Sequence, residues 1–210
     1  MAVTTSSRVE RRMARTRQAL IEAAARLIAE GRAGRASIQE ITEYADIGFG
    51  SFYTYFDSKD ELFRVASQEF LERWGDMIDR ACTDIEDPAE RFAASLRISG
   101  RLSWTHPEVA RFLIGVGLDI LDEPAGLAPR ARRDIRNGQL AARFTIADTE
   151  LALSAVAGGM LGLFRRHQRH PDRVEPSAVD ELAEAALRML GVPATDALRL
   201  STAELLAADA

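Results

Sequence analysis

The segment from Ser37 to Leu62 constrains the fold most strongly, because it carries two short apolar patterns of helical spacing separated by a glycine-containing break. The apolar residues are Ile38, Ile41 and Ala45 before the break, and Phe52 and Phe56 after it. A short break between two short helices is typical of a helix-turn-helix unit. Because neither pattern can build a core alone, we expect both helices to pack on a third, which the residues from about Thr16 to Gly31 predict.

The residues around Phe52 and Phe56 give the second helix a surface of hydroxyls, aromatic rings and glycines. Such a surface suits DNA, since hydroxyls bond to phosphates and glycines let a backbone approach a groove. The alternative is an ordinary polar helix face in contact with water. Ser37 followed by Glu40 predicts a capped start for the first helix, which would leave Ser37 and Gln39 facing outward.

The same segment resembles the DNA-binding region of the TetR family of bacterial transcription regulators. The matching residues are Ile41, Ala45, Ile47, Gly50, Phe52, Tyr53, Tyr55, Phe56, Lys59, Asp60 and Leu62. Thr42, Asp46 and Gly48 depart from the family pattern, but Asp tolerates a left-handed backbone and Gly is an acceptable helix N-cap. The surface and the resemblance together predict DNA contacts from Ser37, Gln39, Gly48, Phe49, Gly50, Ser51, Tyr53, Thr54, Tyr55 and Lys59.

The formal net charge of the chain is -5, which by itself argues against a nucleic-acid binder. Its distribution argues for one, because residues 1–35 hold eight arginines and three glutamates and so carry +5, leaving -10 for the remainder. We expect residues 1–7 to be disordered and the arginines that follow to form a flexible arm, with a solvated charged tail as the alternative. The candidate phosphate contacts in this arm are Arg11, Arg12, Arg15 and Arg17.

The rest of the chain is predicted to be helical, since it contains no alternating strand-like run and no internal repeat. We therefore expect an all-α fold of about nine to ten helices. Residues 1–57 would form the arm and the helix-turn-helix domain, and residues 58–210 an effector-binding and dimerisation domain. The most apolar run, residues 151–164, is too short for a membrane span of about 20 residues. A single cysteine, Cys82, suits a reduced cytoplasmic setting.

Enzyme chemistry has no evident carrier in this sequence. The three histidines all follow residue 105, and no glycine-rich phosphate loop follows a strand. His167 and His170 stand at a helical interval, but the arginines around them repel a cation. We therefore expect no catalytic site, no metal and no cofactor.

Two long helices near the C-terminus are candidates for a dimer interface. The first carries small residues and the second an apolar stripe, and two such helices from each subunit would form a four-helix interface. Core packing within one chain is the alternative, but the resemblance favours a dimer, because TetR-like proteins pair through their last two long helices. The predicted interface residues are Gly158, Gly159, Gly162, Val179, Leu182, Ala183, Ala186 and Leu190.

The central helices contain enough aromatic surface to line an apolar pocket, although plain core is the alternative. The candidate ligand-binding residues are Trp74, Phe92, Trp104, His106, Phe112, Met160 and Phe164. The resemblance implies a small-molecule effector in this part of the chain. These features together predict a homodimeric transcriptional regulator, in the first instance a repressor, that leaves a near-palindromic double-stranded DNA operator when its effector binds. The alternative is a ligand-sensing or interaction protein of the same fold that has lost DNA binding.

Overall fold

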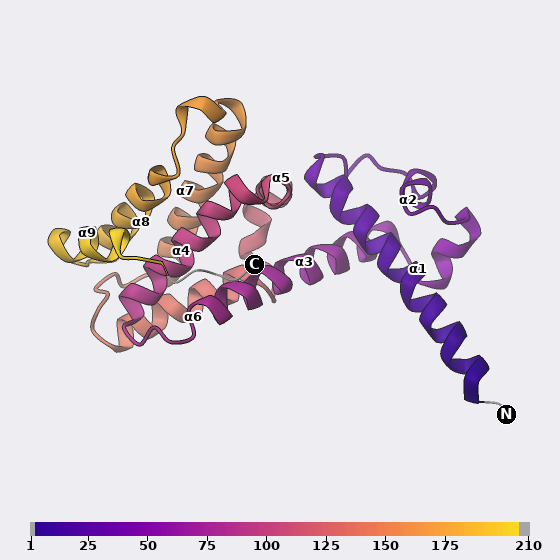
Figure 1. Cartoon of the computed structure of the whole chain (residues 1–210), viewed down its shortest axis with the longest axis horizontal. Helices are drawn as coiled ribbons and strands as arrows, with labels where there is room; N and C mark the ends of the chain where they lie inside the picture. Colours follow the sequence, from indigo (N-terminus) through magenta and orange to yellow (C-terminus); the bar gives the residue numbers. More distant parts are fainter. Residues whose placement is uncertain (1–2, 206–210) are drawn as a thin grey trace. The chain divides into compact units, whose positions relative to one another are not determined.

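The computed structural model describes residues 3–205, and these form helices joined by turns and loops without a β-strand (Figure 1). Within this range there are nine α-helices and three short 3-10 helices, so the predicted all-α fold is confirmed. In chain order they are α1 (Val3–Ala29), α2 (Ile38–Tyr44), η1 (Phe49–Thr54), α3 (Lys59–Ala81), α4 (Pro88–Thr105), α5 (Pro107–Val116), η2 (Gly117–Leu121), α6 (Leu127–Leu140), α7 (Thr149–Arg169), η3 (Pro171–Arg173), α8 (Ser177–Met189) and α9 (Ala194–Thr202). Across the described residues, no helix is both long enough and apolar enough to span a membrane.

The chain divides into two compact units within α3. Unit 1 is Met1–Phe70 and unit 2 is Leu71–Ala210. The first half of α3 contributes the fully buried Leu62 and Ala66 to unit 1. The boundary expected after Asp57 precedes α3, whereas the two compact units meet inside this helix.

Unit 1 is built on α1, whose inward face carries Leu20, Ala24 and Leu27 at 0% exposure. Ile41 of α2 and Phe52 of η1 are equally buried, and α2 contacts both α1 and η1. The predicted packing of two short helices on a third is therefore confirmed. Apolar residues at helical spacing determine this arrangement, because each element buries one narrow stripe.

Helix α1 begins at Val3, so the expectation of disorder through residue 7 and of a flexible arginine arm is wrong from Val3 onward. Residues 1 and 2 lie outside the described part of the chain. Neither proline nor glycine occurs between Val3 and Ala29, and this stretch is rich in Arg and Ala, which favour helix. The helix therefore continues well beyond the part that is packed against a core.

The turn between α2 and η1 has a left-handed backbone at Asp46, where φ is 53°. Asp adopts this conformation more readily than most residues, so its departure from the family pattern fits the turn. The helix expected over residues 48–56 is instead the six-residue 3-10 helix η1. Gly48 and Gly50 lower the helix propensity, and Gly48 has no side chain to cap the element, which explains its shortness.

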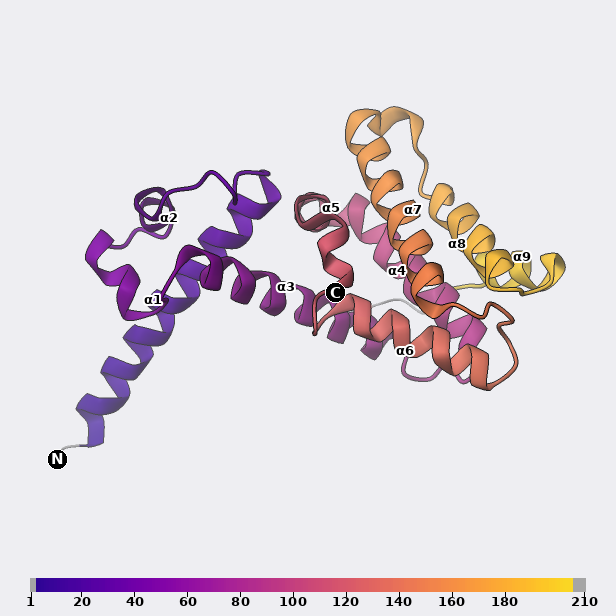
Figure 2. The ribbon, with the colours of Figure 1, turned by 180° about the vertical axis from the view of Figure 1, so that it is seen from behind.

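Unit 2 is organised around α4, which contacts α5, α6, α7, α8 and α9. Helices α7 and α8 follow one another and pack side by side, as the view from behind shows (Figure 2). Gly100 of α4 lets α8 approach closely, since a Cβ atom at this position would lie 2.4 Å from Cγ1 of Val179. Phe92, Ile135 and Leu187 are among the residues that this packing buries.

Candidate functional site

A cavity of about 140 Å³ lies in unit 2 and is lined by α3, α4, α6 and α7 with η2 and the end of α5. Its walls are mainly apolar and include Phe92, Leu113, Ile120, Val156 and Phe164. Each comes from the inward stripe of an amphipathic helix, so the cavity is a gap in the core where the stripes do not fully interdigitate. A mostly apolar cavity with a few polar groups is the usual form of a small-molecule site.

Three of the predicted ligand-binding residues line this cavity: Phe92, Met160 and Phe164. The other four do not, and ring contacts or core packing account for them. Trp104 stacks on His167 with ring centroids 4.1 Å apart, and Trp74 lies against His106 at 5.5 Å. Phe112 is 1% exposed in the core beside Leu113, which takes the wall position instead. Aromatic content alone does not distinguish these environments.

The polar wall of the cavity was not predicted from the sequence. It consists of Ser95, Ser99, Asp79, Arg130 and Asp134. Ser99 donates to the carbonyl of Ser95 at 2.7 Å, and Ser95 donates to Sγ of the buried Cys82 at 3.4 Å. Burial raises the pKa of the Cys82 thiol, so this thiol stays protonated.

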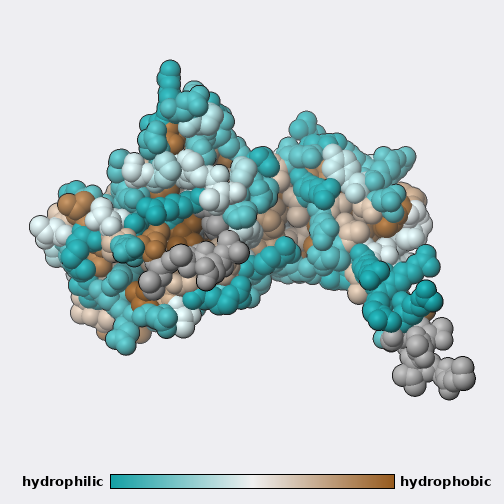
Figure 3. All heavy atoms as spheres, viewed as in Figure 1, coloured by the Kyte–Doolittle hydropathy of each residue, from teal (hydrophilic) through white to brown (hydrophobic). Residues whose placement is uncertain are grey.

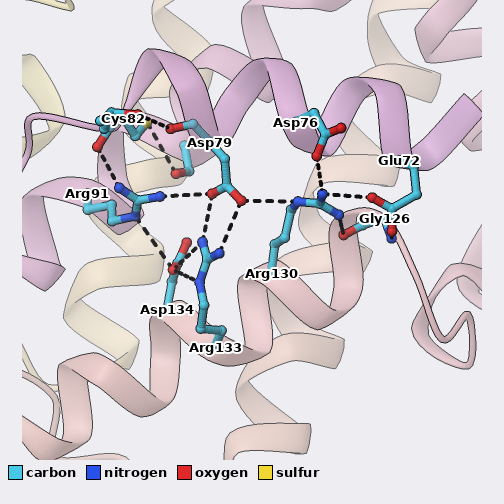
Figure 4. A network of polar contacts seen from close by, with 11 residues as sticks. Glu72, Asp76, Asp79, Cys82, Arg91, Gly126, Arg130, Arg133 and Asp134 are labelled. Atoms are coloured by element: carbon cyan, nitrogen blue, oxygen red, sulfur yellow. Dashed lines mark hydrogen bonds and ion pairs between the residues drawn. The ribbon is translucent and has the colours of Figure 1, made fainter.

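Asp79 of α3 is the centre of an ion-pair network that joins α3 to α4 and α6 (Figure 4). Its Oδ1 accepts from Nη2 of Arg91 at 2.8 Å and Nη2 of Arg133 at 2.7 Å, and its Oδ2 accepts from Nε of Arg130 at 3.1 Å. The hydrogen bonds from Arg133 are the main cause of the low pKa of Asp79, about 2. This carboxylate is therefore ionised and accepts hydrogen bonds at neutral pH.

Arg130 extends the network two turns along α3, because its Nη2 donates to Glu72 at 2.7 Å and also contacts Asp76. Glu72 in turn accepts from the backbone N–H of Gly126 at 2.9 Å. Asp134 lies at the other end, 4% exposed, and accepts from Nε of Arg133 at 2.9 Å. Burial raises the pKa of Asp134, in contrast to its neighbour Asp79. Two carboxylates with opposite pKa shifts thus share one wall of the cavity.

Most of the residues predicted to contact DNA are exposed on unit 1. Phe49 and Tyr53 of η1 are 54% and 58% exposed, and Gln39, Gly48, Gly50 and Thr54 are exposed as well. Ser51 and Tyr55 are half-buried. Phe49 lies outside the core, so its ring is accessible, as a DNA contact requires.

Four predicted DNA contacts also bond within unit 1, among them Gln39, whose Nε2 donates to Oε1 of Glu43 at 3.0 Å. Oγ of Ser37 caps α2 by accepting from the N–H of Glu40 at 3.1 Å, as the sequence predicted. Nζ of Lys59 donates to the carbonyls of Gly34 and Ala36, both at 3.4 Å. Arg17 pairs with Glu69 at 3.0 Å and lies over the ring of Phe56, whereas Arg15 is exposed. Lys59 and Ser37 thus fix the start of α2 in place.

Two family models match this chain. The model described as "Bacterial regulatory proteins, tetR family" matches residues 20–66, which contain α2 and η1. The model described as "Tetracyclin repressor-like, C-terminal domain" matches residues 87–202, more than half of the chain. The chain belongs to the TetR family. It is therefore a transcriptional regulator and not an enzyme, as the sequence predicted.

Solved structures of TetR-family regulators resemble this one over most of its length. RolR in complex with resorcinol is 34% identical, with 95% of this chain and 99% of that chain covered and a TM-score of 0.71. RolR without ligand is also 34% identical. The match covers 90% of this chain and 97% of that chain, with a TM-score of 0.68. SmeT, the repressor of the Stenotrophomonas maltophilia multidrug efflux pump SmeDEF, shares the fold at 17% identity. The match covers 82% of this chain and 89% of that chain, with a TM-score of 0.60. No curated protein matches this chain in a sequence comparison.

TetR-family regulators dimerise. Four of the eight residues predicted for the interface are, however, buried within the single chain. Val179, Ala183 and Leu190 are 0% exposed and Ala186 is 6% exposed within a single chain, so a second chain cannot reach them. They belong to the core, because α8 turns this stripe toward α4 and α9. Leu182 packs on Gly159, where a Cβ atom would lie 3.0 Å from Leu182 Cδ1.

Gly158 and Gly162 remain on the outer face of α7, with open space beside both. The same face carries Leu151, which is 62% exposed, and Ala155. The outer face of α8, of which the sequence analysis predicted only Leu182, has apolar residues at the same helical intervals. These are Ala178, Leu182, Ala185 and Met189, all half-buried or exposed.

Proposed function

We propose that this chain is a homodimeric repressor that leaves its operator when a small hydroxylated aromatic molecule enters the cavity of unit 2. One observation carries the proposal: the polar wall of an apolar cavity is built from the ion pairs that hold α3. Helix α3 continues from unit 2 into unit 1. A ligand that alters these ion pairs therefore acts on the helix that follows the DNA-binding elements.

The size of the cavity supports a single aromatic ring as effector. A dry cavity of about 150 Å³, lined by apolar side chains, is known to accept benzene. The cavity here, at about 140 Å³, is of that size and has similar walls. The relative RolR, 34% identical over 95% of this chain, has been crystallised with resorcinol, a benzene ring with two hydroxyl groups. We infer an effector of the same chemical class.

The polar wall supports hydroxyl groups on that ring. Asp79, ionised at neutral pH, accepts a hydrogen bond from a phenolic O–H, and Arg130 donates one to a phenolic oxygen. Asp134 offers a second acceptor, 4% exposed and close to the first through Arg133. A site built for hydroxyl groups discriminates strongly against a ring that lacks them, because its buried polar groups would then lose partners.

In this proposal, domain roles follow the two units. The helix-turn-helix of unit 1 binds the major groove, with Tyr53, Tyr55 and Lys59 at phosphates and Gln39 and Phe49 near base edges. Gly48, Gly50, Ser51 and Thr54 allow or complete this approach. Unit 2 holds the effector and the partner subunit. Two such reading units related by a twofold axis require an operator with near-palindromic half-sites.

The release mechanism is a shift between two arrangements of α3. Without effector, Asp79 binds Arg130 from α6, Arg133 from α6 and Arg91 from α4. When a phenolic hydroxyl bonds to Asp79 or Arg130, it replaces part of this set and α3 moves against α6. The effector favours the released state only by the difference between its affinities for the two arrangements.

Calorimetric titration with resorcinol and with toluene tests the effector class. We expect resorcinol to bind, and to bind at least tenfold more tightly than toluene, because only resorcinol satisfies the polar wall. Asp134→Asn keeps the shape of the site and removes a charged acceptor. It should therefore weaken the binding of resorcinol by roughly tenfold and leave the binding of toluene unchanged.

A matched control for that titration is Asp180→Asn, since Asp180 also pairs with two arginines, Arg97 and Arg101, but does not line the cavity. This variant should bind resorcinol as the natural sequence does. Equal binding of resorcinol and toluene, or equal losses in the two variants, would refute the assignment of the cavity.

A further inference from the structure

The segment of α1 from Arg8 to Arg15 is exposed on every side. The first buried residue after this segment is Leu20. At 1.5 Å per residue, Arg8 lies about 18 Å along the axis from Leu20. Figure 3 shows this end of unit 1 as a hydrophilic surface. The segment therefore contributes nothing to the core of unit 1 and needs another explanation.

Four arginines occupy one face of this segment: Arg8, Arg11, Arg12 and Arg15. At 3.6 residues per turn they fall within an arc of about 100°, while Glu10 points to the opposite side. The buried residues Leu20 and Ala24 also lie on the side away from the arginines. We call these four arginines the basic stripe. It spans about 10 Å along the helix axis.

The basic stripe works against the stability of the helix that carries it. Like charges at intervals of three and four residues repel one another on a helix surface. An arrangement of like charges that opposes the helix without serving the core is expected where a partner of opposite charge binds.

We propose that the basic stripe binds phosphates of the DNA duplex that flanks each operator half-site. The inference rests on the proposed function, which supplies the operator DNA, and adds a DNA contact outside the helix-turn-helix. Arginine pairs with phosphate through two parallel N–H groups, and a row of about 10 Å spans about three base pairs of rise. A helix about 10 Å wide does not fit a minor groove of about 6 Å, so the contact is with the backbone and independent of sequence.

The test compares the natural sequence with Arg8→Gln/Arg12→Gln on DNA from upstream of its own gene. Glutamine preserves helix propensity and removes two charges from the stripe. We expect the variant to bind with a slope of log affinity against log salt that is shallower by about 1.8 per protomer, since each lost phosphate contact removes about 0.9. Hydroxyl-radical footprints should shorten by up to about three base pairs at the outer edges and stay unchanged in the centre.

The matched control is Arg80→Gln/Arg111→Gln, which removes two exposed arginines from unit 2 and changes the net charge equally. Its slope and footprint should equal those of the natural sequence. An unchanged slope and footprint in the stripe variant would overturn the inference while leaving the proposed function intact. Failure of the natural sequence to bind any DNA would overturn both. Loss of binding to anionic lipid vesicles, with DNA binding unaltered, would point to a membrane and overturn the inference as well.

Discussion

Asp79 lies at the centre of the ion-pair network of unit 2. Three arginines from two helices donate to its carboxylate, and these hydrogen bonds hold its pKa at about 2. Its side chain is 27% exposed, so solvent screens the ion pairs only in part. A carboxylate with three cationic partners ties α3 to α4 and α6 at the wall of the cavity.

Replacement of Asp79 should destabilise the protein in a pH-dependent way. The pKa falls from 3.8 to about 2 on folding, so the ionised form contributes roughly 2 kcal/mol to the free energy of unfolding at pH 7. This stability is present above pH 3.8 and is lost as the pH falls toward 2. Urea unfolding of Asp79→Asn from pH 7 to pH 3 should therefore show a deficit that shrinks below about pH 4.

The matched control for Asp79 is Asp76→Asn, one turn away on the same helix. Asp76 also contacts Arg130, but its side chain is 56% exposed. Its loss should change the free energy of unfolding by less than about 1 kcal/mol, as for other surface ion pairs. Equal deficits in both variants, or a deficit in Asp79→Asn that stays constant with pH, would contradict the role given to Asp79.

Individual residues show where sequence reasoning succeeds and where it fails. Ser37 and Asp46 were predicted correctly, because capping and left-handed turns depend on neighbours in the chain. Asp79, Arg130 and Asp134 were missed, because their contact depends on how α3 meets α6. Charged residues on amphipathic helices resemble an ordinary solvated face until the packing is known.

The positions of the helices were predicted more reliably than the surfaces against which they pack. The periodicity of α8 identified Val179 and Ala183 as one apolar stripe, but it did not tell whether that stripe faces its own chain or another. The close approach of α4 at Gly100 decides the matter in favour of the chain's own core. The N-terminal extent of α1 was likewise missed, since a run of arginines at a chain end is usually solvated and irregular.

The outer face of α7 leads to a test of the proposed dimer. Gly158 has open space around it in a single chain, between the exposed Ala155 and Gly162. Gly158→Glu would place a charge in the proposed interface, where it would be buried without a partner. The dissociation constant of the dimer should therefore rise at least tenfold. Sedimentation equilibrium measures this change directly.

A suitable control for the dimer test is Thr83→Glu, which adds the same charge at an exposed position at the end of α3. It should leave the association unchanged. A Gly158→Glu protein that remains folded and associates as strongly as the natural sequence would show that α7 does not form the interface.

The molecule as a whole combines two compact units that share one helix, α3. Unit 1 exposes Gln39, Phe49 and Tyr53, and unit 2 encloses a cavity whose polar wall holds the second half of α3. The family and the two-unit fold followed from the segment Ser37–Leu62 and from helical periodicity. The position of the cavity did not, because it arises only where several helices of unit 2 meet.

The most direct test of this account measures the release of DNA by the effector. Fluorescence anisotropy would follow a labelled duplex from upstream of the chain's own gene while resorcinol is added to its complex with the protein. The matched variant is Ala157→Leu, which adds three carbons to the cavity wall and alters no ion pair. The account predicts that the natural sequence releases the duplex and that the variant binds it equally well but keeps it. Equal release from both proteins, or retention by both, would contradict it.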